Sequence, residues 1–414
     1  MKLLNQTLAS DLTPQARQRG LTVALVTWFL MNAGFFLIIP LLSVHYVDDL
    51  GWAAAFIGVV LAVRQFLQQG LTLFGGALAD RVGAKGLIAL GTLVRTVSFV
   101  LMGFAKTPAM LFWGGVLAAL GGALFEAPLK ASVAALAPAA QLGQLYARVG
   151  VLQNLARTVG PIIGGVLILY DFAWVGAAAA GFFLGAFVLV LVWMPAVQVS
   201  NEKQPMSQGL NLAFHDRPFL LYTALMMGFW FMWTQLSIAM PLEVKALTGS
   251  DSSVGVLFTV NAVIAIVLQV PLLRLAQRFL RPMPMIIVGI VSMAFSLGLV
   301  ALVETVWQLY VSVFFFAAGI VLVMPNAETI AASLANPTAR GAYFGVNSLA
   351  LAVGGGIGHI AGGALVDYAL VHGVHMLPWV TFGLVGMLTA VSMLHFYRHN
   401  RTRMTPGLVL AVAD

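Results

Sequence analysis

The sequence predicts an all-α integral membrane protein with 12 transmembrane helices, arranged as two pseudo-symmetric halves of six helices each. Composition is the first observation behind this prediction: of 414 residues, 61% are hydrophobic and only 8% are charged. That is too little polar surface to cover a soluble protein of this length. The other two observations are that the apolar residues gather in membrane-length runs, and that the second half of the chain repeats the first.

Each predicted helix is an apolar run of about 20 residues or more, the length that crosses about 30 Å of hydrocarbon. The runs lie at 21–45, 52–78, 86–105, 108–137, 146–169, 172–195, 218–243, 252–273, 283–303, 306–335, 341–366 and 374–397. The first run lacks a small-residue cleavage site and is long enough to span the bilayer, so we expect it to be retained as a helix.

Lysine and arginine concentrate on one side of the predicted helices. Of the 21 such residues, fifteen lie in the termini and in the loops on the same side as the termini. Only Lys106 and Lys245 lie in the opposite loops, and the remaining four fall inside runs: Arg64, Arg95, Lys130 and Arg157. Because basic residues stay on the cytoplasmic side, we expect both termini in the cytoplasm.

An internal repeat divides the predicted helices into two halves. A displacement of 198 residues aligns the stretch 160–167 with 358–365, and a displacement of 197 aligns 79–81 with 276–278. We therefore predict an N-terminal six-helix bundle at 1–199 and a C-terminal bundle with a cytoplasmic tail at 217–414. The polar stretch 200–216 is the predicted cytoplasmic linker. Parallel halves of this kind are typical of secondary transporters.

The stretch between the second and third runs reads Gly76-Ala-Leu-Ala-Asp80-Arg81-Val-Gly83-Ala-Lys85. It resembles the loop pattern that the major facilitator superfamily of transporters carries between helices 2 and 3. Glycines permit a tight reversal there, and an acid beside bases can tie helix ends together. Ala84 departs from the pattern, which usually has arginine at that position. The resemblance implies a role in conformational change for Gly76, Asp80, Arg81, Gly83 and Lys85.

Three further stretches bear on the family's proton-driven members. In the fifth run, Gly160, Pro161, Gly164 and Gly165 follow the pattern that such antiporters carry, and small residues four apart favour close helix packing. The stretch from Gly34 to Pro40 in the first run resembles a drug-exporter pattern. The fourth run departs, because the stretch 117–126 lacks the arginine that proton-coupled members often have there.

Two acids lie inside runs, Glu126 in the fourth and Glu328 in the tenth. A charge at the centre of a membrane helix costs about 2.5–3.5 kcal/mol, so such residues tend to face the bundle or water. Glu126 precedes Lys130 by one helical turn, where an ion pair can form. This leaves two interpretations, a structural ion pair or a carboxylate that binds a proton or a cation. Since Glu328 aligns with Lys130 in the repeat, a salt bridge between these two is a further hypothesis.

Arg64, Arg95 and Arg157 each lie near the middle of a run. They could form an internal hydrogen-bond network with nearby glutamines, including Gln65 and Gln68, or they could contact substrate. Aromatic residues of the first and seventh runs could wall a pocket for flat lipophilic compounds, by stacking and by cation–π contact. These residues are Phe35, Phe36, Trp230, Phe231 and Trp233, with Pro40 near the outer end of the first run.

The stretches 51–58, 64–70 and 74–85, with 328–341 at the end of the tenth run, are similar to bacterial multidrug-resistance proteins in the drug:H⁺ antiporter family of the superfamily. This resemblance spans essentially the whole chain. The resemblance implies a multi-pass, monomeric exporter in the bacterial inner membrane that exchanges protons for amphipathic or lipophilic drugs. Two alternatives remain open. One is an exporter of an anionic metabolite, sugar or lipid on the same fold, because that fold serves many substrates. The other is a passive uniporter or channel without proton coupling.

No motif in the sequence indicates an enzyme. The chain has no cysteine, its seven histidines show no metal-ligand spacing, and no phosphate-binding loop of the GxxxxGK[ST] type is present. We therefore expect no cofactor, no metal and no ATP-driven step. The net charge of +7 reflects the one-sided loops rather than a nucleic-acid surface, so we expect the bilayer, small-molecule substrate and protons as partners.

Overall fold

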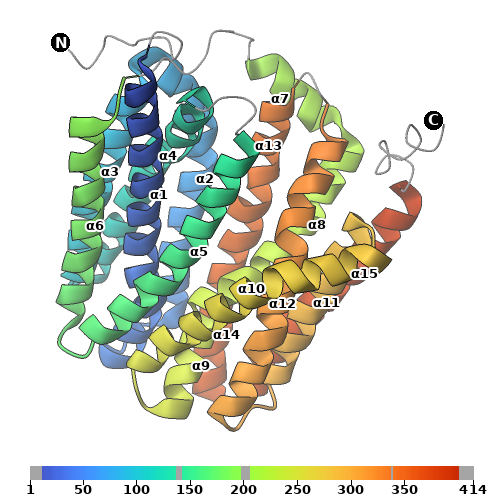
Figure 1. The fold of residues 1–414 in the computed structure, drawn as a ribbon. Helices are drawn as coiled ribbons and strands as arrows, with labels where there is room; N and C mark the ends of the chain where they lie inside the picture. Colours follow the sequence, from blue (N-terminus) through green and yellow to red (C-terminus); the bar gives the residue numbers. More distant parts are fainter. Residues whose placement is uncertain (1–11, 137–141, 197–205, 337–338, 401–414) are drawn as a thin grey trace. The chain divides into compact units, whose positions relative to one another are not determined.

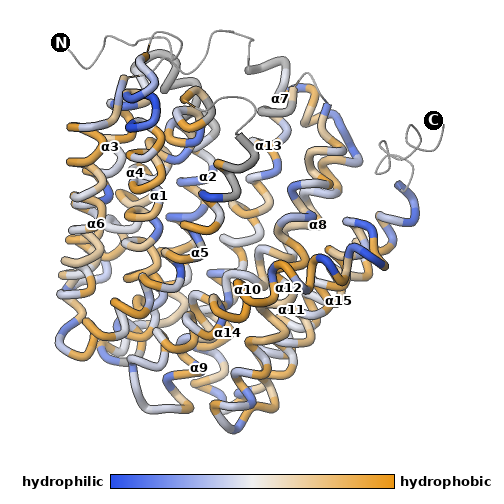
Figure 2. The backbone as a smooth tube through the Cα atoms, viewed as in Figure 1, coloured by the Kyte–Doolittle hydropathy of each residue, from blue (hydrophilic) through white to orange (hydrophobic). Residues whose placement is uncertain are grey.

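The computed structural model describes residues 12–136, 142–196, 206–336 and 339–400. Within these ranges it describes the backbone alone at 48, 73–82, 134, 142–144, 146–147, 154, 206–208 and 340–341. Every regular element of the described chain is helical (Figure 1). Hydrophobic residues run along most of the length of these helices (Figure 2), which is the composition expected of membrane-embedded segments.

The elements of the first half follow one another with short connections. They are α1 (Pro14–Ser43), the π-helix η2 (Val44–Asp49), α2 (Ala54–Val82), α3 (Ala84–Gly103), α4 (Pro108–Leu136), α5 (Leu142–Leu167) and α6 (Phe172–Trp193). Sequence-encoded caps set several of the ends. Thr13 accepts a hydrogen bond from the Ala16 amide at 3.2 Å ahead of Pro14, and Asp171 accepts one from the Ala173 amide at 2.8 Å.

The second half contains more breaks. Its elements are α7 (Met206–His215), α8 (Arg217–Trp233), the 3₁₀ helix η4 (Thr234–Ser237), α9 (Ala239–Thr248), α10 (Ser252–Phe279), α11 (Pro282–Val300), α12 (Val306–Leu334), α13 (Arg340–Leu349), the π-helix η5 (Ala350–Gly355), α14 (Gly356–His372) and α15 (Met376–Asn400). Two predicted helices are each built from three elements, α8–η4–α9 and α13–η5–α14. Most of the predicted linker 200–216 forms the helix α7.

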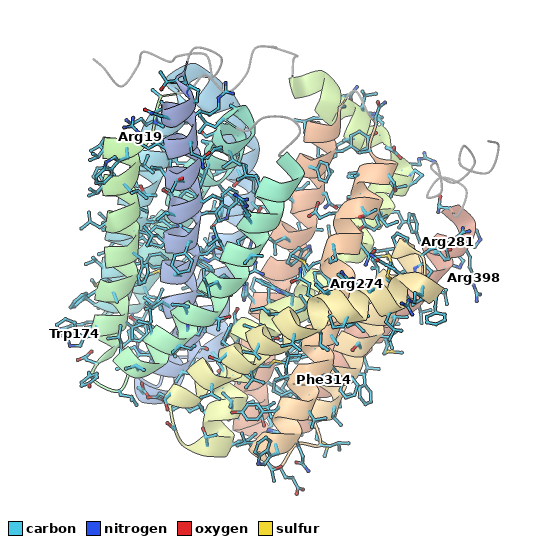
Figure 3. The ribbon with its side chains drawn as sticks, in the orientation of Figure 1. Arg19, Trp174, Arg274, Arg281, Phe314 and Arg398 are labelled. Atoms are coloured by element: carbon cyan, nitrogen blue, oxygen red, sulfur yellow. The ribbon has the colours of Figure 1, made fainter. Side chains whose placement is uncertain are left out.

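Eleven segments of the described chain are long and apolar enough to cross a membrane. The helix α5 is not among them, because its side chains are described only at 145, 148–153 and 155–167, and none of these stretches alone is long enough to cross a membrane. Together these helices give the predicted fold class, an all-helical membrane protein. Large apolar side chains remain exposed along the helices, among them Trp174 at 62% and Phe314 at 43%. Figure 3 shows Trp174 projecting outward from α6, as expected of a residue facing lipid.

The chain divides into two compact units. Unit 1 comprises Met1–Trp52, Val59–Lys203 and Gly249–Thr259, and unit 2 comprises Ala53–Gly58, Gln204–Thr248 and Val260–Asp414. In unit 1, α3 packs against α4 and α6, and α1 packs against α5 and α6 (Figure 1). In unit 2, α11 packs against α12 and α15, and α8 packs against η5, α14 and α15.

Glycines at repeated positions bring helices together in both units. A Cβ atom on Gly160 would lie 2.7 Å from the Ala33 carbonyl oxygen, so α5 approaches α1 at backbone distance. The corresponding residues of unit 2, displaced by 198, are Gly358 and Phe231, and there the same distance is also 2.7 Å. The repeat seen in the sequence is therefore a repeat of helix contacts, in which a small residue permits close approach.

Candidate functional site

Five polar or charged side chains of unit 1 form a connected group, which we call the unit 1 polar cluster. Its members are Arg64 and Gln68 on α2, Arg95 on α3, and Glu126 and Lys130 on α4. The two guanidinium groups are almost fully buried, with Arg64 at 4% and Arg95 at 3% exposure. Charges so far from solvent require partners inside the protein.

Gln68 is the centre of the unit 1 polar cluster. Its Oε1 accepts hydrogen bonds from Arg64 Nη1 at 3.1 Å and from Arg95 Nη2 at 2.7 Å. Its Nε2 donates to Glu126 Oε2 at 3.2 Å. The second nitrogen of the Arg64 fork, Nη2, donates to Gln65 Oε1 at 3.0 Å. The glutamine network proposed for these arginines is thus present, and Gln68 extends it to a carboxylate.

Glu126 and Lys130 form the ion pair expected from their spacing. Lys130 Nζ donates to Glu126 Oε1 at 3.1 Å, one helical turn away on α4. The lysine side chain is 53% exposed and the glutamate side chain 27% exposed, so the pair lies at the accessible edge of the cluster. Both oxygens of the carboxylate therefore have a donor, Gln68 on one and Lys130 on the other.

Two glycines on α4 make room for Arg95. A Cβ on Gly121 would lie 2.7 Å from Arg95 Cγ, and a Cβ on Gly122 would lie 2.6 Å from the Gln68 side-chain carbonyl carbon and closer still to Arg95 Nη2. Arg95 Nε also donates to the Ala118 carbonyl oxygen at 3.0 Å. The Arg95 side chain, from α3, thus fills the space beside the stretch of α4 that lacks the family's arginine. The missing arginine was visible in the sequence, but the role of these glycines was not.

Aromatic rings surround the two guanidinium groups. Arg64 Cζ lies 4.9 Å from the centre of the Phe35 ring, and Arg95 Cζ lies 5.3 Å from the same ring. Arg95 Cζ is also 5.0 Å from the Phe125 ring and 5.5 Å from the Phe183 ring. Each contact is within the range of a cation–π interaction, so the rings partly replace the hydration that the arginines lose.

Arg157 lies apart from this cluster. It is on α5, with its Cζ 5.4 Å from the centre of the Phe36 ring on α1. Its Nε is buried and has no hydrogen-bond partner among the described residues. The predicted aromatic residues of the first helix therefore do contact arginines, Phe35 beside Arg64 and Arg95, and Phe36 beside Arg157.

The equivalent packing in unit 2 carries no charge. A displacement of 198 aligns Arg95 with Met293, and the glycine pair 91 and 121 with Gly289 and Gly319. A Cβ on Gly91 would lie 2.6 Å from the Gly121 carbonyl oxygen, and a Cβ on Gly289 would lie 2.8 Å from the Gly319 carbonyl oxygen. Met293 occupies the place in the second contact that Arg95 occupies in the first. The fold therefore does not require an arginine at this position.

The loop motif between α2 and α3 is described in part. Gly83 links the two helices with a φ of +97°, a conformation that favours glycine, so the predicted tight reversal is present. Lys85 is half-buried in the first turn of α3. The side chains of Asp80 and Arg81, like position Gly76, lie outside the residues whose side chains are described.

The helix 5 motif is described more fully. Gly160 and Gly164 face α1, and Gly165 lies beside Gly255.

The predicted site residues of unit 2 are more dispersed. Glu328 is exposed on α12. Trp230 and Trp233 on α8 contact each other edge to face, with ring centres 5.4 Å apart, and Phe231 is buried against Phe382 of α15. The pairing of Glu328 with Lys130 and the walls of a drug pocket stay predictions.

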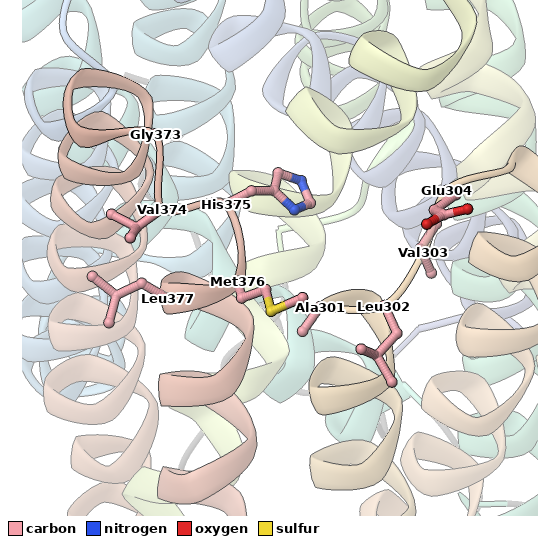
Figure 4. Close-up of a pocket in the computed structure, with 9 residues that line it drawn as sticks. All are labelled: Ala301, Leu302, Val303, Glu304, Gly373, Val374, His375, Met376 and Leu377. Carbon is pink, nitrogen blue, oxygen red and sulfur yellow. The ribbon is translucent and has the colours of Figure 1, made fainter.

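A pocket of about 530 Å³ lies in unit 2, between the loops 301–304 and 373–377 (Figure 4). None of the site residues predicted from the sequence lines it. His375, one of its lining residues, contacts Glu243 of α9, with Nε2 at 3.1 Å from Oε1 and 3.0 Å from Oε2. The sequence did not predict this contact, because the two residues are 132 positions apart in the chain.

Asp367 is a second contact that sequence reasoning missed. It lies on α14 in unit 2, and its two oxygens accept hydrogen bonds from the amides of Ala54 at 2.8 Å and Ala55 at 2.7 Å. These amides belong to the first turn of α2, which has no partner for them within the helix. The first turn of α2 is therefore capped by a carboxylate more than 300 positions away in the chain.

The fold and the unit 1 polar cluster define a multi-pass membrane protein with interacting charges buried between its helices, which is an arrangement of membrane transporters. Comparison with known proteins gives the family. The Major Facilitator Superfamily model matches residues 23–248 and 229–408, and the chain belongs to that family. It is thus a transporter by family rather than an enzyme.

Similar proteins cover nearly the whole chain. It is 35% identical over 395 residues to the multidrug resistance protein MdtH of Enterobacter sp. (strain 638), covering 95% of this chain and 98% of that protein. It is 34% identical over 388 residues to MdtH of Salmonella newport (strain SL254), covering 94% and 96%. Both values confirm the predicted resemblance to bacterial multidrug-resistance proteins.

Solved structures agree on the fold. A POT family transporter in complex with 5-aminolevulinic acid gives a TM-score of 0.77 at 16% identity, covering 94% of this chain and 97% of that one. A peptide transporter POT in complex with sulfate gives a TM-score of 0.79 at 14% identity, covering 94% and 96%. At such low identity these matches establish the fold alone.

Proposed function

We propose that this chain is a proton-coupled secondary transporter that exports amphipathic or lipophilic drugs across the bacterial inner membrane by alternating access. The observation that carries the proposal is Glu126, a carboxylate held between Gln68 and Lys130 inside unit 1. A group that changes charge on binding one proton, and that has a competing base beside it, is what coupling requires. The drug-export part is supported by the relatives named multidrug resistance protein MdtH.

In this proposal a proton and a substrate compete for Glu126. With Glu126 ionised, the carboxylate accepts from Lys130 and can attract a cationic drug. When a proton binds, the attraction to Lys130 weakens and the drug is released. The two six-helix halves, 1–199 and 217–414, alternate the exposure of this site, with both termini in the cytoplasm and the monomer as the working unit.

Other predicted residues take supporting roles in the proposal. Arg64, Arg95 and Arg157 tune the charge of the site, and Glu328 is a second candidate for the proton. The aromatic residues Phe35, Phe36, Trp230 and Trp233, with Pro40, shape the substrate path. The conformational motifs are the loop residues Gly76, Asp80, Arg81, Gly83 and Lys85 and the helix 5 residues Gly160, Pro161, Gly164 and Gly165.

Proton movement caused by substrate tests this proposal. The purified protein is reconstituted into vesicles that contain the pH-sensitive dye pyranine. A panel of amphipathic cationic, zwitterionic and neutral drugs is then added without an imposed gradient. Coupled export predicts proton movement with at least one drug. In vesicles with an imposed pH gradient, it also predicts drug accumulation that collapses when the gradient is dissipated. Drug flux that continues unchanged without a gradient, and that moves no protons, identifies a passive uniporter instead.

A second candidate function is export of an anionic compound on the same fold. It is favoured by the charge balance of the described interior of unit 1. Arg64, Arg95 and Arg157, with Lys130 at the accessible edge, accompany Glu126, the one acid among the described side chains there. Such a surplus attracts a negative group. Competition experiments with a series of organic anions separate the two candidates. Organic anions should inhibit transport by an anion exporter, whereas they should leave the transport of a labelled cationic drug by a drug exporter unchanged.

A further inference from the structure

We infer that Gln68 is a positioning residue that fixes which oxygen of Glu126 receives the proton. The inference rests on the proposed role of Glu126 as proton carrier, and it begins with the orientation of one side-chain amide. A guanidinium group has five donors and no acceptor. Arg64 and Arg95 both approach the same end of the Gln68 amide, at 3.1 Å and 2.7 Å. That end must therefore be the carbonyl oxygen.

Fixing one end of the amide fixes the other. With Oε1 held by two arginines, the Nε2 group faces Glu126 Oε2 at 3.2 Å and can only donate. A hydroxyl hydrogen on Oε2 would meet this donor head-on, so Oε2 is kept as an acceptor. The remaining oxygen, Oε1, has Lys130 as its partner at 3.1 Å. The incoming proton thus binds Oε1, because Lys130 is 53% exposed and can move away from it, whereas Gln68 is held in place by the two arginines.

The charged groups that face Glu126 come from three helices. Lys130 lies on α4 itself, Arg64 on α2 and Arg95 on α3. Both arginines reach Glu126 through Gln68 rather than by an ion pair of their own. Gln68 therefore links the two arginines to the carboxylate. Lys130 is the cationic partner that a proton on Glu126 displaces.

The internal repeat indicates that Gln68 does more than hold the helices together. Displacement by 197 aligns Gln68 with Ala265, and displacement by 198 aligns Arg95 with Met293 and Glu126 with Met324. Unit 2 keeps the same glycine contact between the equivalent helices, Gly289 against Gly319, without any of these polar groups. The packing of α11 against α12 therefore forms without the equivalents of Arg95 and Glu126, and the position equivalent to Gln68 is also apolar.

Infrared difference titration of the reconstituted protein tests the inference without needing a known drug. The carboxyl band that is present in the unmodified protein and missing from Glu126→Gln reports protonation of Glu126. Gln68→Met keeps the length of the side chain but cannot donate, so the midpoint of that band should rise by about one pH unit. Gln68→Glu still accepts from both arginines but faces Glu126 with negative charge, so the midpoint should rise further.

Gln69→Met is the matched control. Gln69 follows Gln68 on α2 and is also buried, at 9% exposure. Among the described hydrogen bonds, none joins Gln69 to Glu126. Its midpoint should equal that of the unmodified protein. If Gln68→Met does not fold, Gln68→Glu alone decides, because it retains the acceptors that both arginines need.

The outcomes separate this inference from the proposed function. Unchanged midpoints in both Gln68 variants, with the Glu126 band still identified, overturn the positioning role and leave the transport proposal standing. Normal drug–proton exchange in Glu126→Gln overturns the proposed function itself. Raised midpoints in both Gln68 variants, with the Gln69 control unchanged, support the inference.

Discussion

Arg95 illustrates how a buried charge is accommodated residue by residue. It enters from α3, passes the glycines of α4 and ends in contact with Gln68 and with four aromatic rings, those of Phe35, Phe99, Phe125 and Phe183. Each of these contacts offsets part of the cost of removing a guanidinium group from water. Because Met293 fills the equivalent place in unit 2, the same slot also accepts an uncharged side chain.

This equivalence gives a substitution that separates charge from packing. We expect Arg95→Met to fold and to keep its thermal stability within a few degrees. Coupled export should fall at least about tenfold, which corresponds to a loss of about 1.4 kcal/mol in the stabilisation of the rate-limiting transport step. Export is measured in vesicles and stability by thermal unfolding in detergent. Full export activity in this variant would show that the guanidinium group is dispensable.

Gly122 tests the same contact from the opposite helix. Gly122→Ala places a methyl group where the Arg95 guanidinium and the Gln68 amide lie, so we expect overpacking of about 1–3 kcal/mol and a loss of coupled export. Gly181→Ala on α6 is the control, because a Cβ there meets nothing within 4 Å. The control should export normally. Equal activity of the two variants would contradict the close contact.

At the scale of elements, helix boundaries were predicted well where hydropathy alone sets them and less well elsewhere. The run predicted at 252–273 continues as α10 to Phe279, because Arg274 and Arg278 resemble a loop in sequence but lie exposed on the last turns of a helix. The π-helices η2 and η5 and the helix α7 have no sequence signal of their own. α7 is held by tertiary packing, with Ala213 buried in one cluster with Phe219 and Tyr343.

The polar cluster was predictable only in its local part. The spacing of Glu126 and Lys130 predicted their ion pair, and the position of Arg64 and Arg95 inside apolar runs predicted buried partners. The orientation of Gln68 depends on three helices meeting, which a single sequence does not specify. The same holds for the capping of α2 by Asp367, because the two partners are distant in the chain.

The Asp367 cap leads to a prediction for α2. Asp367→Ala removes the acceptors of two amides in its first turn and a negative charge from a helix N-terminus. We expect a loss of about 1–2 kcal/mol in the free energy of unfolding, measured by denaturant titration in detergent micelles. Leu370→Ala on the same helix, with Leu370 at 71% exposure, should leave stability unchanged. Equal stability of both variants would rule out a capping role for Asp367.

At the scale of the whole molecule, the two halves share their helix contacts but not their chemistry. Gly160 and Gly91 have counterparts in Gly358 and Gly289, each at a helix contact of the same kind. The positions of unit 1 that carry Gln68, Arg95 and Glu126 are apolar in unit 2. The two halves therefore share a scaffold, and these three polar groups belong to unit 1 alone.

The most direct test of the central claim is proton flux by the Glu126→Gln variant. Reconstituted vesicles containing pyranine receive a drug that moves protons in the unmodified protein, and Glu328→Gln is measured in parallel. If Glu126 carries the proton, Glu126→Gln should remain folded and lose drug-dependent proton movement. Proton movement at the unmodified rate in Glu126→Gln would contradict the claim, and a loss confined to Glu328→Gln would assign the proton to Glu328.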